Sequence, residues 1–204
     1  MAGPGYRIET PRLVLRCWNP EDAPLLQVAV EDSREHLAPW MPWAREEKTL
    51  DQQIELLREF RGKFDLGEDF IYGIFDLGER RVLGGTGLHK RAGDNSREIG
   101  YWIHVDHVGQ GLATEASAAL TKVAFEVDRV DRVEIHCAPA NARSAAIPEK
   151  LGFVHEATLR QRLPLGDGVV TDRMIWTLLG KEYEGSLPAA AEIAAWDAAG
   201  RRLL

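Results

Sequence analysis

Long apolar runs are missing from this chain of 204 residues. None approaches the roughly 20 residues that a membrane-spanning helix requires, and residues 1–7 contain no apolar core of a secretory signal. We therefore expect a cytoplasmic protein without membrane contact. The length suits one domain of moderate size with a sizeable core.

Cysteine is scarce as well, with only Cys17 and Cys137 present. Both fall in strand-like segments, which favours two small buried side chains over a disulfide framework. The histidines are scattered. His104 and His107 stand three residues apart without a third ligand nearby, so we expect no metal site.

Positive charge is in deficit, with 25 basic against 32 acidic residues and a formal charge of -7. Proteins that grip nucleic acid backbones need the opposite balance, so we expect no direct nucleic acid partner. The negative charge is compatible with a cationic acceptor such as an amine.

What the chain does contain is a mixed order of helices and strands, without internal repeats. Alternation and glycine-bounded turns predict strands at 12–18, 70–76, 81–88, 98–105, 133–138, 154–163 and 169–178. Capping signals predict helices after Asn19 and Thr49, a third helix at 113–127 and a short one ending at Gly152. The alanine-rich tail, 187–204, is predicted to add a helix.

The strand, crossover helix and strand between 98 and 138 imply one parallel pair in an otherwise antiparallel arrangement. The fold class is therefore α+β: a mixed, mostly antiparallel sheet of about seven strands with helices on both faces. We expect one domain over residues 6–183 and a helical extension over 184–204.

The most informative segment is the glycine turn Val108-Gly109-Gln110-Gly111-Leu112-Ala113, followed by Thr114. A helix N-terminus offers unpaired N–H groups and partial positive charge to a phosphate. The glycines let a phosphate approach the backbone, and Thr114 can add a hydroxyl donor. Taken alone, the pattern also fits an ordinary tight turn, and it is neither a dinucleotide fingerprint nor a Walker loop.

Four ordered motifs resemble the GNAT acetyltransferase superfamily, over roughly residues 6–183. The motifs are Glu98-Ile99-Gly100-Tyr101-Trp102-Ile103 with 108–116, Asn141-Ala142-Arg143-Ser144 with 149–153, Thr10-Pro11-Arg12-Leu13-Val14-Leu15-Arg16, and 37–43. The first two resemble the acyl-CoA-binding segments. The last two resemble the Rim-type branch, which acetylates N-termini of ribosomal proteins. The resemblance implies the GNAT fold, an N-acetyltransferase activity and acetyl-CoA as cosubstrate, with no metal.

The resemblance also implies roles for individual residues. In this superfamily the strand before the glycine turn splays from its neighbour, so backbone groups of Ile103, His104 and Val105 would bind the pantetheine arm and the thioester oxygen. The pyrophosphate would lie on residues 108–114. Asn141 would bind the pantetheine amides, or form an Asx-turn at the end of a strand.

Two positions depart from the family pattern. Val108 stands where members usually carry Gln or Arg, so phosphate binding must depend on backbone N–H groups. Pro148 stands where many members carry a general-acid tyrosine, so that role is vacant or filled by another group.

Glu98 is the leading candidate for a general base acting through water; alternatively it is a solvated carboxylate paired with Arg97. Ser144 is a candidate hydrogen-bond donor to the departing sulfur. It also fits the N-cap of a helix that holds Pro148 in its first turn. Both roles can hold at once.

Trp40 and Trp43 stand in a proline-bounded loop and either wall the acceptor cleft or pack over the sheet. Three functions follow as alternatives: acetylation of a peptide or protein N-terminus, possibly ribosomal; acetylation of a small amine such as an antibiotic or polyamine; or a silent acyl-CoA-binding sensor. Dimers are common in the superfamily, which makes a homodimer a candidate assembly.

Overall fold

A computed structural model describes residues 5–204 of the chain. The helices are α1 (Ala23–Leu37), α2 (Leu50–Asp65), α3 (Leu112–Glu126), α4 (Ala142–Lys150) and α5 (Gly180–Tyr183), with 3-10 turns η1 (Pro20–Asp22), η2 (Pro42–Arg45) and η3 (Val105–His107). The strands are β1 (Arg7–Glu9), β2 (Val14–Cys17), β3 (Phe70–Phe75), β4 (Val82–His89), β5 (Ser96–Ile103), β6 (Arg132–Cys137), β7 (Val154–Gly166), β8 (Val169–Leu179) and β9 (Ala194–Trp196). No helix among these residues is long and apolar enough to cross a membrane.

All the strands belong to one mixed sheet in the order β7-β8-β6-β5-β4-β3-β2-β1-β9. β5 and β6 pair in parallel through the α3 crossover, whereas the other neighbours are antiparallel. The predicted α+β class, the parallel pair and the seven predicted strands are therefore confirmed.

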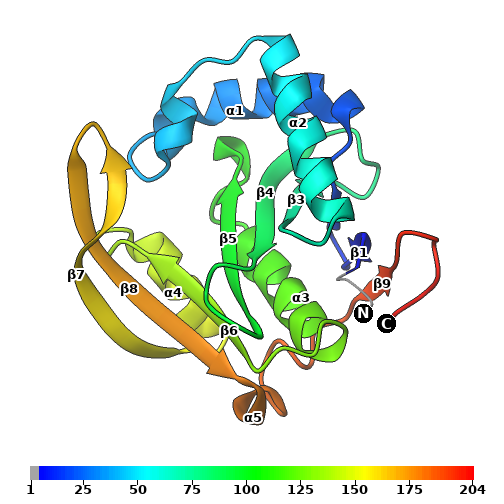
Figure 1. Ribbon diagram of the computed structural model, residues 1–204, viewed down its shortest axis with the longest axis vertical. Helices are drawn as coiled ribbons and strands as arrows, with labels where there is room; N and C mark the ends of the chain where they lie inside the picture. Colours follow the sequence, from blue (N-terminus) through cyan, green and yellow to red (C-terminus); the bar gives the residue numbers. More distant parts are fainter. Residues whose placement is uncertain (1–4) are drawn as a thin grey trace.

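Helices cover both faces of the sheet, because successive strand residues point to opposite sides. Leu15 belongs to the core beneath α3, whereas its neighbour Val14 belongs to the core beneath α1 and α2. Figure 1 shows α1 and α2 together at the top of the molecule, with α3 and α4 below them and the β7–β8 hairpin at one edge.

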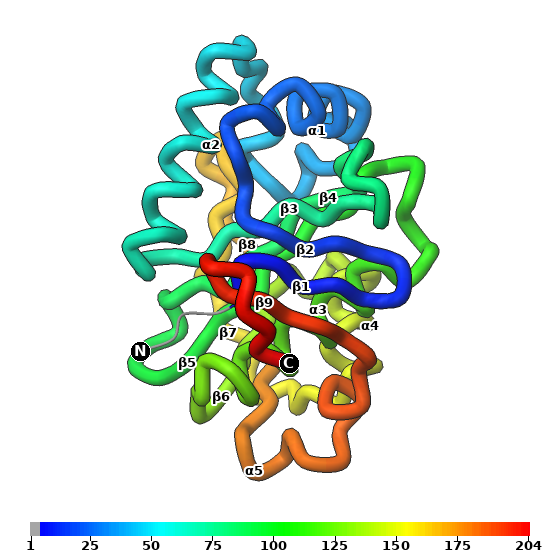
Figure 2. The backbone as a smooth tube through the Cα atoms, turned by 90° about the vertical axis from the view of Figure 1, so that its right-hand side faces the viewer, coloured from blue at the N-terminus to red at the C-terminus, as the bar shows by residue number. Residues whose placement is uncertain are grey.

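The C-terminal tail differs from the prediction. Instead of a helical extension, residues 194–196 form β9, which pairs with β1 at the edge of the sheet (Figure 2). Ala195 is fully buried there, and its carbonyl accepts a hydrogen bond from the N–H of Leu203. The helix propensity of alanine is a weak preference, and burial against an open sheet edge outweighs it. Pro188 and Gly200 also disfavour a continuous helix.

Helix starts follow the predicted caps. Thr49 accepts a hydrogen bond from the N–H of Gln52, and the Gln52 side chain accepts one from the N–H of Thr49. At Asn19 the roles are divided: the Asp22 carboxylate accepts from the Asn19 N–H, whereas the Asn19 amide oxygen accepts from Arg61. These contacts fix α1 and α2 over the face where the pocket described below opens.

Candidate active site

A wedge opens between the two parallel strands. β5 and β6 pair from Ser96↔Arg132 to Ile99↔Ile135. Beyond that point β5 continues to Ile103 and β6 to Cys137, and the two strands no longer pair with each other. From Gly100 onward, one edge of β5 is therefore free of a strand partner. Backbone groups on that edge are available to a bound molecule.

Of the three residues predicted to use backbone groups, Ile103 is the one whose N–H faces the wedge. The N–H of His104 donates to Leu83 on β4, at 2.8 Å. Because alternate residues of a strand bond to opposite sides, the neighbouring Ile103 faces away from β4. The N–H of Val105 donates to the Ser33 hydroxyl at 3.0 Å. The carbonyls of His104 and Val105 in turn accept from the N–H groups of His107 and Val108, so the backbone groups of these two residues are already paired.

The glycine turn lies between the wedge and α3. Gly109 and Gly111 have φ angles of 77° and 79°, in the left-handed region that favours glycine. Gly111 is the N-cap of α3 and provides no side-chain cap, so the first N–H groups of the helix have no partner within it. Both glycines are exposed, whereas Leu112 is buried and Val108 packs against the core. Phosphate contacts here must come from the backbone, from Gln110 or from Thr114.

Arg12 brings a positive charge to this turn, which the sequence did not indicate. Its guanidinium donates to the Gln110 carbonyl at 2.9 Å and to the Glu115 carboxylate at 2.6 Å. The hydroxyl of Thr10 also donates to Glu115, at 2.6 Å. The segment before β2 is thereby fastened to the first turn of α3. The only signal in the sequence was that Arg12 lies in a motif matching the Rim-type branch.

The start of α4 corrects one prediction. The N-cap is Asn141, whose side-chain oxygen accepts a hydrogen bond from the N–H of Ser144 at 3.2 Å. Ser144 is therefore inside the first turn rather than at the cap, and Pro148 lies in the helix interior. A proline there removes one helix hydrogen bond, the bond to the carbonyl four residues earlier. That carbonyl belongs to Ser144, and the hydroxyl of Tyr101 donates to it at 3.1 Å.

Glu98 is buried rather than solvated, and its partner is Arg91 instead of Arg97. Arg91 donates two hydrogen bonds to the carboxylate, at 2.9 and 2.6 Å, and Nδ1 of His136 lies 3.3 Å from it. Burial raises the pKa of Glu98, but the hydrogen bonds and charge of Arg91 outweigh it, and the net pKa lies below the ordinary value. Arg97 pairs with Asp128.

His89 and Asp69 form a second polar pair near the wedge. Nδ1 of His89 lies 2.9 Å from the Asp69 carboxylate. Nε2 of the same ring faces Gly100, because a Cβ atom added to that glycine would lie 3.3 Å from it. Gly100 is the residue at which β5 separates from β6. A histidine held by a carboxylate at one nitrogen has the other available for proton transfer. Nothing in the sequence pattern pointed to this pair.

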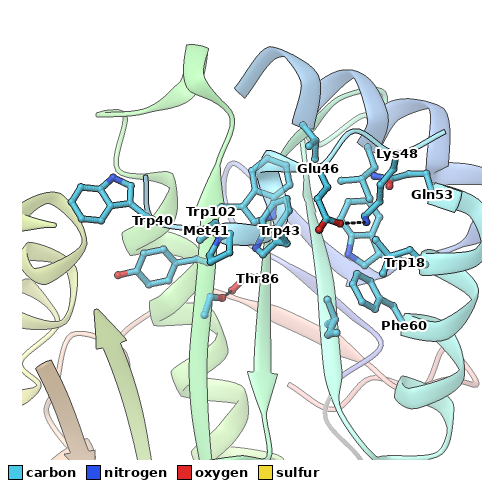
Figure 3. A pocket seen from close by; sticks show the side chains of 18 of the residues that line it. Trp18, Trp40, Met41, Trp43, Glu46, Lys48, Gln53, Phe60, Thr86 and Trp102 are labelled. Carbon is cyan, nitrogen blue, oxygen red and sulfur yellow. Dashed lines mark hydrogen bonds and ion pairs between the residues drawn. The ribbon is translucent and has the colours of Figure 1, made fainter. Parts of the chain in front are cut away.

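A pocket of about 580 Å³ opens on the α1–α2 face of the sheet. Trp40 and Trp43 line it together with Trp18 and Trp102. The rings of Trp43 and Trp102 pack edge to face, with centroids 6.0 Å apart. Figure 3 shows them in the middle of the pocket, with Trp40 on one side and Trp18 on the other.

Polar groups interrupt these aromatic walls. Glu31 and Glu46 line the pocket, and Glu46 lies 3.8 Å from Lys48. Gln53 is 4% exposed, and its side-chain oxygen has no hydrogen-bond partner among residues 5–204. A buried acceptor without a partner costs free energy unless a ligand or water satisfies it. The pocket therefore suits a ligand that carries N–H groups. Within the same described range, no three histidine, cysteine or acidic side chains are grouped to hold a metal ion.

Comparisons with known proteins agree with this geometry. Residues 12–154 match the family model described as the acetyltransferase (GNAT) domain. The chain is 30% identical to the putative ribosomal N-acetyltransferase YdaF of Bacillus subtilis, over 85% of this chain and 94% of that one. It is 28% identical to the [Ribosomal protein uS5]-alanine N-acetyltransferase of Escherichia coli, over 88% and 94% of the two chains. The structure of Mycobacterium smegmatis RimJ with CoA-disulfide superposes with a TM-score of 0.78 at 24% identity, covering 93% of this chain and 91% of that one.

Proposed function

Because the chain belongs to the GNAT family and is an acetyl-CoA-dependent N-acetyltransferase, we propose that its acceptor is the α-amine of a peptide or protein N-terminus. The amine attacks the thioester directly while both substrates are bound. Such an acceptor, ribosomal or other, would place the enzyme in the cytoplasm.

The observation that carries this proposal is that the wedge and the aromatic pocket meet on the same strand. The wedge begins at Gly100, and Gly100, Tyr101 and Trp102 also line the pocket. A thioester in the wedge and an amine in the pocket would therefore approach each other without a covalent intermediate on the protein. The nearby thiol, Cys137, is buried, and burial raises its pKa, so it is a poor nucleophile.

We assign the cofactor by its chemistry. The pyrophosphate would lie on the N–H groups of Gly109 to Thr114, beside the ion pair of Arg12 with Glu115 and without the side chain that Val108 lacks. The N–H of Ile103 would stabilise the thioester oxygen as negative charge develops. Asn141 caps α4 and would use its remaining polar groups on the pantetheine amides.

For the proton of the amine, the proposed base is Glu98 acting through water. Its carboxylate lies near the wedge, yet Arg91 occupies both of its oxygens. The contact between His89 and Asp69 supports a second candidate, because Nε2 of His89 lies beside Gly100 and makes no hydrogen bond within residues 5–204. Ser144 would donate a hydrogen bond to the departing sulfur.

Two features favour a polypeptide acceptor over a small amine. One relative named above is a ribosomal-protein alanine N-acetyltransferase and another a putative ribosomal N-acetyltransferase. The pocket volume of about 580 Å³ admits either acceptor, so the second feature is the Gln53 oxygen, a buried acceptor that a peptide N–H would satisfy. The charged lining is mixed, with Glu31 and Glu46 beside Arg34, Lys48 and Arg91, and Trp43 offers an aromatic face to an ammonium group. The oxygen of Gln53 would accept an N–H from the acceptor backbone.

Release of CoA thiol, measured over a panel of peptides and small amines, tests this assignment. We expect turnover on peptides with free N-termini and little on polyamines or aminoglycosides. The reverse order would show that the acceptor is a small amine.

A further inference from the structure

We infer that Tyr101 is a positioning residue for acetyl transfer: its hydroxyl donates to Ser144 and thereby directs the Ser144 hydroxyl to the departing sulfur. This inference depends on the proposed place of the sulfur beside Ser144. It goes further by assigning the second member of a donor pair, in a chain where Pro148 occupies the position of the family's tyrosine.

Ser144 lies between the two strands of the wedge. The Tyr101 hydroxyl, from β5, is 3.1 Å from the Ser144 hydroxyl and 3.1 Å from the Ser144 carbonyl. On the other side of the wedge, β6 ends at Cys137, whose side chain is buried. Any group that enters the wedge between β5 and α4 therefore meets this pair of hydroxyls.

The local sequence explains how a tyrosine from β5 can hold α4. In an uninterrupted helix, the Ser144 carbonyl would accept the N–H of residue 148, which proline does not have. The Tyr101 hydroxyl takes that place at 3.1 Å. Pro148 therefore has two effects. It stands where the family carries a tyrosine, and its missing N–H leaves the Ser144 carbonyl free to accept from the Tyr101 hydroxyl.

The two hydroxyls have one proton each, which limits how they can be arranged. If the Ser144 proton points at a sulfur, the proton left between the two side chains is that of Tyr101, which is then shared between the Ser144 carbonyl and hydroxyl oxygens in a three-centre hydrogen bond. Burial raises the pKa of Tyr101, so the hydroxyl stays protonated and remains a donor. Hydrogen bonds in such a chain strengthen one another.

In the transfer step, the acceptor nitrogen forms its bond to the acetyl carbon and the carbon–sulfur bond breaks, leaving an electron pair on sulfur. The amine loses its proton to the base, and the thiolate later takes a proton from solvent. Tyr101 and Ser144 keep their own protons throughout and stabilise the thiolate by hydrogen bonding.

Binding of CoA and of desulfo-CoA, by calorimetry at pH 7 and pH 9.5, tests the inference without turnover. A free cysteine thiol has a pKa of about 8.5 and a plain alkyl thiol a higher one, so the thiolate fraction of CoA rises between the two pH values. We expect the wild type to prefer CoA over desulfo-CoA at pH 9.5, and Tyr101→Phe to reduce that preference about tenfold. Its kcat should fall by a similar factor, with the KM for acetyl-CoA changing less than about twofold.

Two variants separate the chemical role from a structural one. Tyr183→Phe is the matched control, because it removes a tyrosine hydroxyl that bonds Glu126, away from the wedge. The double variant Tyr101→Phe/Pro148→Ala returns an N–H to the Ser144 carbonyl without the hydroxyl, and we expect it to stay deficient. Full recovery in the double variant would mean that Tyr101 only holds α4 in place, and would overturn the inference.

Ser144→Ala distinguishes this inference from the proposed placement of the sulfur. A thiolate preference that disappears in Ser144→Ala but survives in Tyr101→Phe overturns the role of Tyr101 alone. A wild type without any thiolate preference overturns both. Equal weakening of CoA and desulfo-CoA by Tyr101→Phe also counts against the inference.

Discussion

The carboxylate of Glu98 is held by two hydrogen bonds from Arg91, and this decides how its role can be tested. Burial raises its pKa, but Arg91, with smaller effects of His136 and His89, lowers the pKa by a larger amount, so the net pKa is below the ordinary value. The ordinary value for Glu is about 4.3. Because a depressed pKa keeps the group ionised at every higher pH, Glu98 does not titrate between pH 5.5 and 9. A fall in rate on the acid side of this range must come from another group, such as the acceptor α-amine, with a pKa of about 8.

We expect Glu98→Gln to lower kcat about 100-fold near neutral pH, with CoA affinity unchanged, because the water-mediated base is lost. The midpoint of the acid limb should stay where it is. Glu134→Gln is a matched control, because Glu134 is equally buried and also contacts His136. Steady-state rates from pH 5.5 to 9.5 provide the measurement. Equal turnover in wild type and Glu98→Gln would remove Glu98 from the mechanism, and a loss in His89→Gln would then assign the base to His89.

At this scale the sequence predicts residue types better than their partners. The sequence places Arg97 next to Glu98 as a possible ion-pair partner, but adjacent strand residues point to opposite faces, so the two side chains do not meet. His89, at the end of β4, and Arg91, in the turn after it, both lie close to Glu98. Tyr101 meets Ser144 only because α4 packs across the wedge. Such pairs depend on tertiary structure and carry no local signal.

Among the elements, the junction of the glycine turn with α3 carries the cofactor assignment. Gly111→Glu should weaken CoA binding at least about 100-fold, because it places bulk and negative charge at the helix end that would hold the pyrophosphate. Gly185→Glu is the matched control: Gly185 has a similar φ of 82° and open space around it. Calorimetry with CoA measures both. Unchanged affinity in Gly111→Glu would show that the pyrophosphate binds elsewhere.

Element boundaries were predictable where capping residues mark them, as at Thr49 and Gly152. They were not predictable at α4, because Pro148 suggested a helix start three residues too late. A proline is tolerated inside this helix because Tyr101 satisfies the carbonyl that it leaves without a donor. The compensating group is 47 positions away from the proline and belongs to another element.

For the whole molecule, the sheet has two more strands than the sequence pattern indicates, β1 and β9. Each contains three residues. Strands this short show little alternation, and β9 exists only where β1 offers it an edge. Residues 184–204 therefore include part of the main sheet, which the prediction of a helical extension missed.

Stability measurements can check that the tail belongs to the domain. Ala195→Asp should lower the free energy of unfolding by about 3 kcal/mol or more, since it places a charge at a fully buried position in β9. Ala198→Asp, at an exposed position in the same tail, should change it by less than about 0.5 kcal/mol. Denaturant unfolding of both variants gives the comparison. An equally small effect in Ala195→Asp would mean that the tail is not part of the folding unit.

The central claim is that the wedge and the aromatic pocket join acetyl-CoA to the α-amine of a polypeptide. Its most direct test is mass spectrometry of one peptide that carries a free N-terminus and an internal lysine, incubated with the enzyme and acetyl-CoA. The account predicts a single acetyl group on the N-terminal nitrogen and none on a version whose N-terminus is blocked. Acetylation of the lysine in the blocked peptide, or no acetylation of either peptide alongside turnover of a small amine, would contradict it.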